Sequence, residues 1–398
     1  MRAVSLWVAV AIGFSLPIST ALDNVLAAAL LLCWIASGAY REKLGAVRDN
    51  PLALAAIGFF LLHVLGAAWS VGSRDDVLAA LDKASILLLV PVLVSLKPEA
   101  VWLRRALAAF LAALAITLFL SFLVWWELVP PGTFKGFPYD PVVFKLKITH
   151  SVLMAYGAFV LAIAARESAD RRWRFALATG AALAAFNVLF MVWGRTGQLV
   201  VLALFFYLFL SWFRWRGLLV SVAAGVGMGT TVYFVPSSAL HERTATTIEE
   251  IEDWRAGKPA TIANRRLETW SNSLELLRER SILGYGTGGF AAAYAKQVEG
   301  TAMQPAGHAE NQYLYTAVQL GIAGLTGLLA LLAFQWHWAA RLRTRSETNL
   351  ARGLVILMAI GFLFNPFLHD HTEAFFYAWL SGLLYAGLRP GKGARATT

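Results

Sequence analysis

The side chains of this chain that are best suited to chemistry include an arginine in a short turn next to a long apolar run. Arg195 follows that run and lies between Gly194 and Gly197. A charged group close to a bilayer costs free energy unless it is used, and the two glycines would let an anionic ligand approach the backbone. We therefore interpret Arg195 as an anion-binding residue, with a snorkelling arginine at a helix end as the alternative.

Two further arginines, Arg265 and Arg266, stand where an amphipathic helix is expected to begin. The helix is predicted because apolar residues recur at helical spacing with charged residues between them, at Leu267, Trp270, Leu274 and Leu277. Backbone N–H groups at a helix start favour anions, and a guanidinium can bind two phosphate oxygens at once. Adjacent residues point in different directions from a helix, so we expect one of the two arginines to face a site. Solvated surface charge is the alternative.

A histidine followed by polar residues precedes a late apolar run. The imidazole of His308 can titrate near neutral pH and act as a general base, while Glu310 and Asn311 could orient it or bind sugar hydroxyls. Taken alone, a histidine at a helix mouth is an interfacial residue. Lys147 and His150, at the mouth of an earlier apolar run, could add positive charge to an anion site.

A glycine-rich stretch has a plainer interpretation. The spacing Gly284-x-Gly286-x-x-Gly289 matches the dinucleotide-binding fingerprint. The fingerprint requires a preceding strand within a βαβ unit, and no strand is predicted here. We interpret the stretch as a flexible turn that re-enters the membrane surface.

Two short polar groups remain. His369-Asp370-His371 resembles a metal clip, but no third ligand of suitable spacing is near it. We therefore expect no metal site, and we interpret the triplet as the polar lining of an external cavity. Asp82 and Lys83 are adjacent near the start of another apolar run and are expected to pair with neighbouring polar groups.

Composition places these residues in an integral membrane protein. Of 398 residues, 58% are hydrophobic and 15% are charged, and the mean hydropathy is +0.61, whereas a soluble protein carries about a quarter charged residues. The apolar runs have the length of helices, which predicts a helical bundle and not an outer-membrane barrel. The net charge of +10 comes largely from short loops, so the membrane surface explains it better than nucleic acid does. The single cysteine, Cys33, excludes an intrachain disulfide and a thiolate metal site.

We expect an all-α, polytopic membrane bundle of about twelve transmembrane helices. Their centres lie near Ile12, Leu32, Phe60, Leu88, Leu114, Gly157, Ala184, Phe206, Gly225, Leu325, Leu357 and Trp379. The first run is interpreted as an uncleaved helix and not a signal peptide, because a second run starts almost at once. The predicted organisation is about nine spans in residues 1–234, an active-site loop with amphipathic helices in residues 235–313, and about three spans in residues 314–398.

The distribution of lysine and arginine predicts the orientation of the bundle. Most of the basic residues in the short loops fall on one side, which is therefore cytoplasmic. Both termini are then cytoplasmic and the long polar loop is external. Arg195, His308 and the triplet that starts at His369 all fall on this external face, so we expect one site there.

The order of these motifs resembles the C-terminal signature of the O-antigen ligase and polymerase superfamily. The segments that carry the resemblance are 266–270 (Arg-Leu-Glu-Thr-Trp), 283–290 and 308–314. The turn at residues 194–197 (Gly-Arg-Thr-Gly) is similar to the family's arginine turn. The predicted spans with one large late loop also resemble this family, so the resemblance covers most of the chain.

This resemblance implies an enzyme that transfers an undecaprenyl-diphosphate-linked glycan to an acceptor at the periplasmic face of the inner membrane. It implies that Arg195 and Arg266 hold the donor diphosphate and that His308 assists the acceptor hydroxyl. The transfer would be inverting and independent of metals and cofactors. Many relatives carry a second histidine two positions after the first, where this chain has Glu310, so the base is either His308 or Glu310. Further substrate contacts are expected from Arg265, Glu310, Asn311, Lys147 and His150.

Within the superfamily the pattern favours an O-antigen ligase, with lipid A-core oligosaccharide as acceptor and undecaprenyl-diphosphate-linked O-antigen as donor. A long C-terminal extension, expected of the O-linked protein oligosaccharyltransferases, is absent from the 398 residues. The second large external loop is much longer than the first, whereas the polymerases tend to have two external loops of comparable length. A polymerase or a protein transferase is the alternative within the family, and a polytopic lipid or glycan transporter is the alternative of another class. Membrane lipids are expected partners, nucleic acid is not, and the sequence indicates no oligomeric state.

Overall fold

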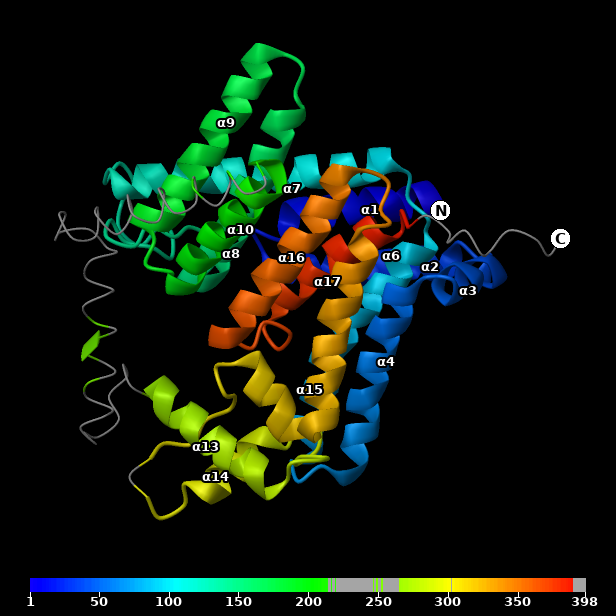
Figure 1. Ribbon diagram of the computed structural model, residues 1–398, viewed down its shortest axis with the longest axis vertical. Helices are drawn as coiled ribbons and strands as arrows, with labels where there is room; N and C mark the ends of the chain where they lie inside the picture. Colours follow the sequence, from blue (N-terminus) through cyan, green and yellow to red (C-terminus); the bar gives the residue numbers. More distant parts are fainter. Residues whose placement is uncertain are drawn as a thin grey trace.

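The computed structural model is helical throughout the part of the chain that it describes. That part comprises residues 1–213, 265–301 and 303–388, with the single residues 216, 219, 246, 248, 249 and 252. Its helices (Figure 1) are α1 (Arg2–Ser15), α2 (Thr20–Ala36), α3 (Tyr40–Arg48), α4 (Pro51–Gly66), α5 (Arg74–Ser85), α6 (Leu89–Ser95), α7 (Ala100–Trp125), α8 (Lys147–Glu167), α9 (Arg171–Phe186), α10 (Arg195–Phe213), α13 (Arg265–Glu279), α14 (Phe290–Gln297), α15 (Gln312–Ala339), α16 (Arg345–Phe364) and α17 (His371–Tyr385). Short 3-10 turns follow α4 and α5, and a π-turn, Asn187–Met191, follows α9.

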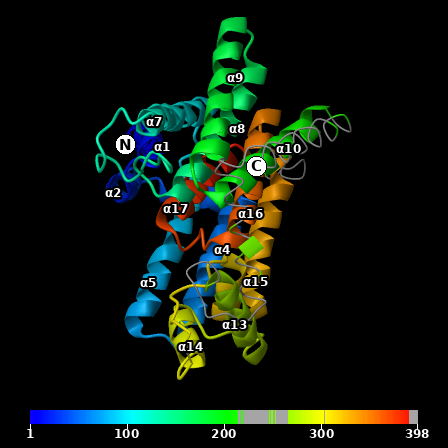
Figure 2. The same cartoon turned by 90° about the vertical axis from the view of Figure 1, so that its left-hand side faces the viewer.

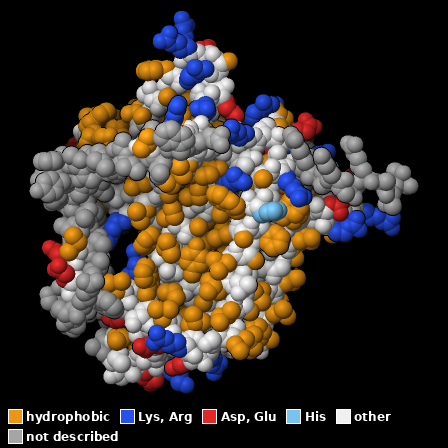
Figure 3. All heavy atoms as spheres, in the orientation of Figure 1, with side chains coloured by type: hydrophobic (Ala, Val, Ile, Leu, Met, Phe, Trp, Pro, Cys, Tyr) orange, Lys and Arg blue, Asp and Glu red, His pale blue; other side chains and the backbone are white. Residues whose placement is uncertain are grey.

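The protein is a multi-pass membrane protein. Within the described residues, eight helical stretches are long and apolar enough to cross a bilayer, or nine if α2 and α3, which bend by 115°, form one span. The predicted centres near Ile12 and Trp379 also lie in helices, but these helices have only 14 and 15 residues. The centre near Gly225 lies outside the described residues, so a total of twelve spans stays a prediction. Hydrophobic side chains cover the middle of the face in Figure 3, and charged side chains gather toward its ends.

Helix α17 lies in the centre of the bundle. Every residue from Thr372 to Tyr385 is buried, as expected for a helix that is apolar around most of its circumference. The Trp379 indole N–H donates to the Ala9 carbonyl over 2.8 Å, and the Phe376 ring lies 5.2 Å from that of Tyr156. These contacts join α17 to α1 and α8, so the loop immediately before α17 starts from a fixed position.

Helix α15 is broken at Gly321, which has φ 63° and ψ −159°. The break leaves backbone carbonyls without partners in the helix, and an unpaired polar group in apolar surroundings costs several kcal/mol. The glycine-rich stretch supplies the missing donors. The N–H of Tyr285 donates to the Val318 carbonyl over 2.9 Å, and that of Gly286 donates to the Gln319 carbonyl over 2.7 Å.

The same stretch is also bonded to α4. The Thr287 N–H donates to the Gly66 carbonyl over 3.1 Å, and the Thr287 hydroxyl donates to the His63 carbonyl over 2.6 Å. Gly286 and Gly288 have φ values of 83° and 78°, which favour glycine. The stretch was expected to be a flexible turn. In the structure it is instead hydrogen-bonded to both α4 and α15, because its N–H groups pair with carbonyls that the break in α15 leaves without partners in the helix.

Helices α13 and α14 lie together beside the N-terminal end of α15 (Figures 1 and 2). The amphipathic helix predicted around Leu267 to Leu277 is present as α13. With α15, these helices form a second hydrophobic cluster that includes Leu276, Phe290, Tyr294, Tyr315 and Val318. This packing fixes the start of α13, which carries Arg265 and Arg266, against the segment that leads into α15.

Candidate active site

An ion pair joins the start of α13 to the segment before α15. The Arg266 Nε–H donates to Glu310 Oε2 over 2.8 Å, and the two side chains are 32% and 39% exposed. Arg265 donates to the Pro305 carbonyl, in the same segment, over 3.0 Å. Both arginines therefore contact the segment before α15, and the expectation that only one of them faces a site stays a prediction.

His308 lies directly beside this ion pair. Its Nδ1 accepts a hydrogen bond from the backbone N–H of Glu310 over 3.2 Å. Burial is the main cause that lowers the pKa of His308, the Glu310 carboxylate opposes this effect, and the cations of Lys83, Arg265 and Arg266 add to it. Burial and the neighbouring cations therefore disfavour the protonated form of the imidazole.

The segment after His308 is anchored to α16 and to the loop that follows it. The Asn311 side chain caps α15 by accepting from the Leu314 N–H over 3.0 Å, and it donates to the Leu363 carbonyl over 3.0 Å. The Leu368 N–H donates to the Gln312 side-chain oxygen over 2.8 Å. Asn311 was predicted to bind substrate, and the structure gives it a positioning role in these two bonds.

The loop between α16 and α17 brings a second histidine to the first. The His369 ring centroid lies 5.9 Å from that of His308, and the Tyr315 hydroxyl is 3.1 Å from His369 Nδ1. Burial, together with the charge of Lys83, lowers the pKa of His369 to about 3. Burial and the neighbouring Glu373 raise the pKa of Asp370 well above its usual range.

Lys83 belongs to the same group of side chains. It projects from α5 and lines, with Gln312, Tyr315 and His369, a cavity of about 20 Å³, which is roughly the size of one water molecule. Its charge acts on His308, His369 and Asp370. In the sequence, Lys83 was recognisable only as a lysine near the start of an apolar run. It was expected to pair with polar neighbours and was not predicted as a site residue. The arginine–histidine cluster, as we name this group, comprises Lys83, Arg266, His308, Glu310, His369 and Asp370.

The arginine turn is bonded to the loop that carries His369. Thr196, next to Arg195 at the start of α10, accepts from the Asn365 side chain over 3.0 Å. Gly194 and Gly197 pack so closely against Ser151 of α8 that a Cβ on either glycine would collide with it. The glycines thus serve helix packing in this structure, and the Thr196 bond connects the Arg195 turn to the cluster through the 365–370 loop.

The two predicted contacts on α8 have different environments. Lys147 is exposed at the first turn of the helix. His150 is buried, and its Nε2 lies 3.0 Å from the Asn187 side-chain oxygen, so this side chain is enclosed between helices and is not presented to a ligand. The nearby Lys145 is also buried, with its ammonium donating to Thr20 and Thr372 over 2.8 and 3.0 Å.

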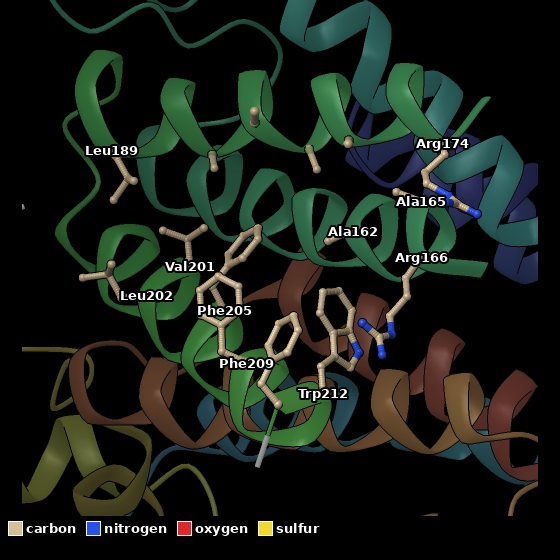
Figure 4. A pocket seen from close by; sticks show the side chains of 15 residues that line it. Ala162, Ala165, Arg166, Arg174, Leu189, Val201, Leu202, Phe205, Phe209 and Trp212 are labelled. Carbon is tan, nitrogen blue, oxygen red and sulfur yellow. The ribbon is translucent and has the colours of Figure 1, made fainter. Parts of the chain in front are cut away.

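A larger cavity lies elsewhere in the bundle. It has a volume of about 830 Å³ and is formed between α8, α9 and α10, with a lining of alanines and aromatic rings. Arg166 and Arg174 stand at one end of it (Figure 4). No member of the arginine–histidine cluster lines this cavity, so its volume alone does not mark it as the reaction site.

Chemically, the arginine–histidine cluster can bind a polyanion and can exchange a proton. Lys83 and Arg266 supply positive charge, and guanidinium groups suit phosphate oxygens. The imidazole of His308 and the carboxyl groups of Glu310 and Asp370 supply acid–base groups within one small region.

A family model matches part of the chain. The family model described as O-Antigen ligase matches residues 179–329, a range that includes Arg195, Arg266, His308 and Glu310. Lys83, His369 and Asp370 lie outside it. This family consists of glycosyltransferase-like enzymes that act on lipid-linked polysaccharides.

The other comparisons add little. No curated protein matches the chain. A solved structure from work on "Structural coordination of polymerization and crosslinking by a peptidoglycan synthase complex" aligns with a TM-score of 0.48 and 17% sequence identity, over 84% of this chain and 94% of that chain. Residues 179–329 of this protein thus match the O-antigen ligase family model, which supports the similarity of its motifs to the O-antigen ligase and polymerase superfamily.

Proposed function

We propose that this protein is an O-antigen ligase. It transfers O-antigen polysaccharide from undecaprenyl diphosphate onto lipid A-core oligosaccharide at the periplasmic face of the inner membrane. The family match supports glycan transfer, and the sequence pattern of one dominant late loop favours the ligase over the polymerase and the protein transferase.

The observation that carries the proposal is the Arg266–Glu310 ion pair beside His308, 2.8 Å long. A diphosphate leaving group develops negative charge as its bond to the sugar breaks, and fixed cations stabilise that charge. Arg266 and Lys83 lie at the cluster, and Arg195 lies in the turn bonded to its loop. Such a set of cations fits a diphosphate better than a neutral sugar.

The reaction is a direct displacement at the anomeric carbon. The acceptor hydroxyl oxygen attacks that carbon, and the bond to the diphosphate oxygen breaks with its electron pair remaining on the diphosphate. A side chain of the cluster accepts the hydroxyl proton. The configuration of the anomeric carbon is inverted, and the cationic side chains stabilise the leaving group without a metal.

The test is complementation of a ligase-null strain that makes the cognate O-antigen and core, read on a lipopolysaccharide gel. Wild type should restore the ladder, while Arg195→Ala and His308→Ala should lose about 10²- to 10³-fold in transfer at equal membrane expression. Arg172→Ala, an exposed arginine at the start of α9, is the matched control and should behave as wild type. If wild type leaves lipid-linked O-antigen unused with the cognate core, the ligase assignment is wrong. Elongation of the lipid-linked glycan in that strain would instead identify a polymerase.

A further inference from the structure

We infer that His308 works as a hydrogen-bond donor through its Nε2–H and that the carboxylate of Asp370 accepts the proton of the acceptor hydroxyl. This inference rests on the proposed function and reverses the role that the sequence suggested for His308. It follows from how the backbone fixes the ring, from where the charges lie, and from which carboxylate is already engaged.

The backbone of Glu310 selects the tautomer of His308. A neutral imidazole has one N–H and one acceptor nitrogen, and the hydrogen bond at one nitrogen determines which of the two carries the proton. His308 Nδ1 accepts from the Glu310 N–H over 3.2 Å, so the proton of the neutral ring is on Nε2. The nitrogen left for substrate can then donate but has no lone pair with which to accept a proton.

The residue that donates this bond is held from outside the segment through its side chain. Glu310 has φ 48°, a left-handed value that is uncommon for a residue other than glycine and costs free energy. This conformation is compatible with the 2.8 Å ion pair to Arg266, which fixes the Glu310 side chain at the end of α13. Arg266 is therefore also a positioning residue for His308, because it acts on the ring through Glu310.

The surroundings of His308 suit an anion and oppose protonation of the ring. Lys83, Arg265 and Arg266 face it with positive charge, His369 is a neutral ring at 5.9 Å, and Glu310 is the carboxylate that opposes them. Burial also lowers the pKa of His308. A donor N–H within a set of cations stabilises the oxygen of a departing diphosphate, as in other sites where charge develops on an oxygen.

Asp370 is the carboxylate that remains for the proton. The Glu310 carboxylate is engaged by Arg266, whereas the Asp370 side chain caps no backbone N–H of α17. Asp370 adjoins His369 and lies within the electrostatic reach of Glu373 on α17, Lys83 on α5 and Glu310 before α15. Burial raises its pKa, which makes its carboxylate a stronger base than an ordinary aspartate.

The proton and electrons balance in this scheme. The acceptor oxygen forms its bond to the anomeric carbon and gives its proton to Asp370. The bond from that carbon to the diphosphate oxygen breaks, and the electron pair stays on the diphosphate, where the Nε2–H of His308 donates a hydrogen bond. His308 is uncharged before and after the step.

The first test reads the tautomer without any substrate. The purified full-length protein is labelled with ¹⁵N-histidine in lipid nanodiscs at pH 7, and the His308 signals are assigned by their loss in His308→Gln. The ¹⁵N shifts distinguish protonated from unprotonated ring nitrogens, and we expect a proton on Nε2 and none on Nδ1. A proton on Nδ1 would overturn the inference, and this readout stands even if the protein transfers no O-antigen.

The second test separates a donor from a base by transfer kinetics with a synthetic undecaprenyl-diphosphate-linked glycan. His308→Gln keeps a side-chain N–H donor but has no titratable group, so it should retain activity within about tenfold of wild type, while His308→Ala should lose about 10²-fold or more. Asp370→Asn should lose about 10²- to 10⁴-fold, and Asp370→Glu should recover part of that loss. His337→Gln, at the opposite end of α15, is the matched control.

The pH profile decides between the two residues. Transfer should fall as the pH drops through the raised pKa of Asp370, because its carboxylate becomes protonated, and this acid limb should persist in His308→Gln. An acid limb that disappears in His308→Gln, or an inactive His308→Gln with folding intact, would show that His308 is the base. Absence of transfer by wild type would count against the proposed function and not against the tautomer.

Discussion

The Arg266–Glu310 ion pair is partly exposed, and this limits what it can contribute to stability. With 32% and 39% of the two side chains exposed, such a pair stabilises a fold by about 0–1 kcal/mol. The pair instead acts through geometry: it fixes the side chain of Glu310 at the start of α13, and the backbone N–H of this same residue donates to His308. Loss of Arg266 should therefore affect transfer far more than folding.

Lys83 gives a prediction at the same scale. Lys83→Ala should raise the KM for the lipid-linked donor by roughly ten- to hundredfold, because one charged contact to the diphosphate is lost. The pKa values of His308 and His369 should also rise, because the charge of Lys83 lowers both in the native protein. Donor kinetics and an NMR titration of the histidines measure the two effects.

The control for this prediction is Lys296→Ala, an exposed lysine on α14. It should leave the donor KM and both histidine pKa values as they are. Unchanged kinetics in Lys83→Ala would remove Lys83 from the donor site.

At the scale of elements, the break in α15 determines the arrangement around the arginine–histidine cluster. The glycine-rich stretch, residues 283–289, donates N–H groups to carbonyls that the break at Gly321 leaves without partners in the helix. This stretch follows α13 and is hydrogen-bonded to α4 and α15. Because α13 carries Arg266 and α15 begins just after Glu310, the glycine-rich stretch fixes the two residues of the ion pair relative to each other.

Gly321→Ala tests this account. An alanine at φ 63° is strained, and its Cβ would collide with the Ile282 carbonyl, so we expect a loss of about 3 kcal/mol or more in the free energy of unfolding. Thermal unfolding in detergent, with transfer activity measured in parallel, checks it. Gly45→Ala in α3, where a Cβ would meet no atom within 4 Å, should be neutral or slightly stabilising. Equal stability of the two variants would mean that the break is not needed.

At the scale of the whole molecule, the cluster and the basic start of α9 lie at different ends. Helices α13 and α14 gather beside the N-terminal end of α15, and α9 projects from the opposite end (Figures 1 and 2). The α9 end carries Arg171, Arg172 and Arg174. The excess of basic residues on the cytoplasmic side of membrane proteins makes that end cytoplasmic in our proposal and the cluster periplasmic.

Cysteine labelling tests this orientation. Cys33 is the single cysteine, so Cys33→Ser gives a background without cysteine, into which Glu299→Cys or Arg172→Cys is introduced at an exposed position. A membrane-impermeant maleimide should label the first variant in intact spheroplasts and the second only after permeabilisation. The reverse pattern would place the cluster in the cytoplasm and contradict a periplasmic ligase.

Much of the fold was predictable from the sequence because its determinants are local. Apolar runs of helix length and the 3.6-residue periodicity predicted the helices, including α13. The order of short motifs predicted a superfamily resemblance that the match to residues 179–329 supports. The composition likewise predicted a multi-pass membrane protein. Arg266, His308 and Glu310 were each singled out by residue type, and the family resemblance implied that Arg266 and His308 act at one site.

Only the tertiary structure decided which side chains meet and in what state. Arg266 and Glu310 are 44 positions apart, and Thr196 and Asn365 are 169 apart, so their contacts depend on helix packing that no local pattern encodes. Lys83 and His369 join the cluster for the same reason, while His150, predicted as a contact, is enclosed against Asn187. The tautomer of His308 depends on the backbone N–H of Glu310, which donates to its Nδ1. Residue types and hydrophobic periodicity therefore determined the helices and the chemical groups, and the packing around a broken α15 determined their geometry.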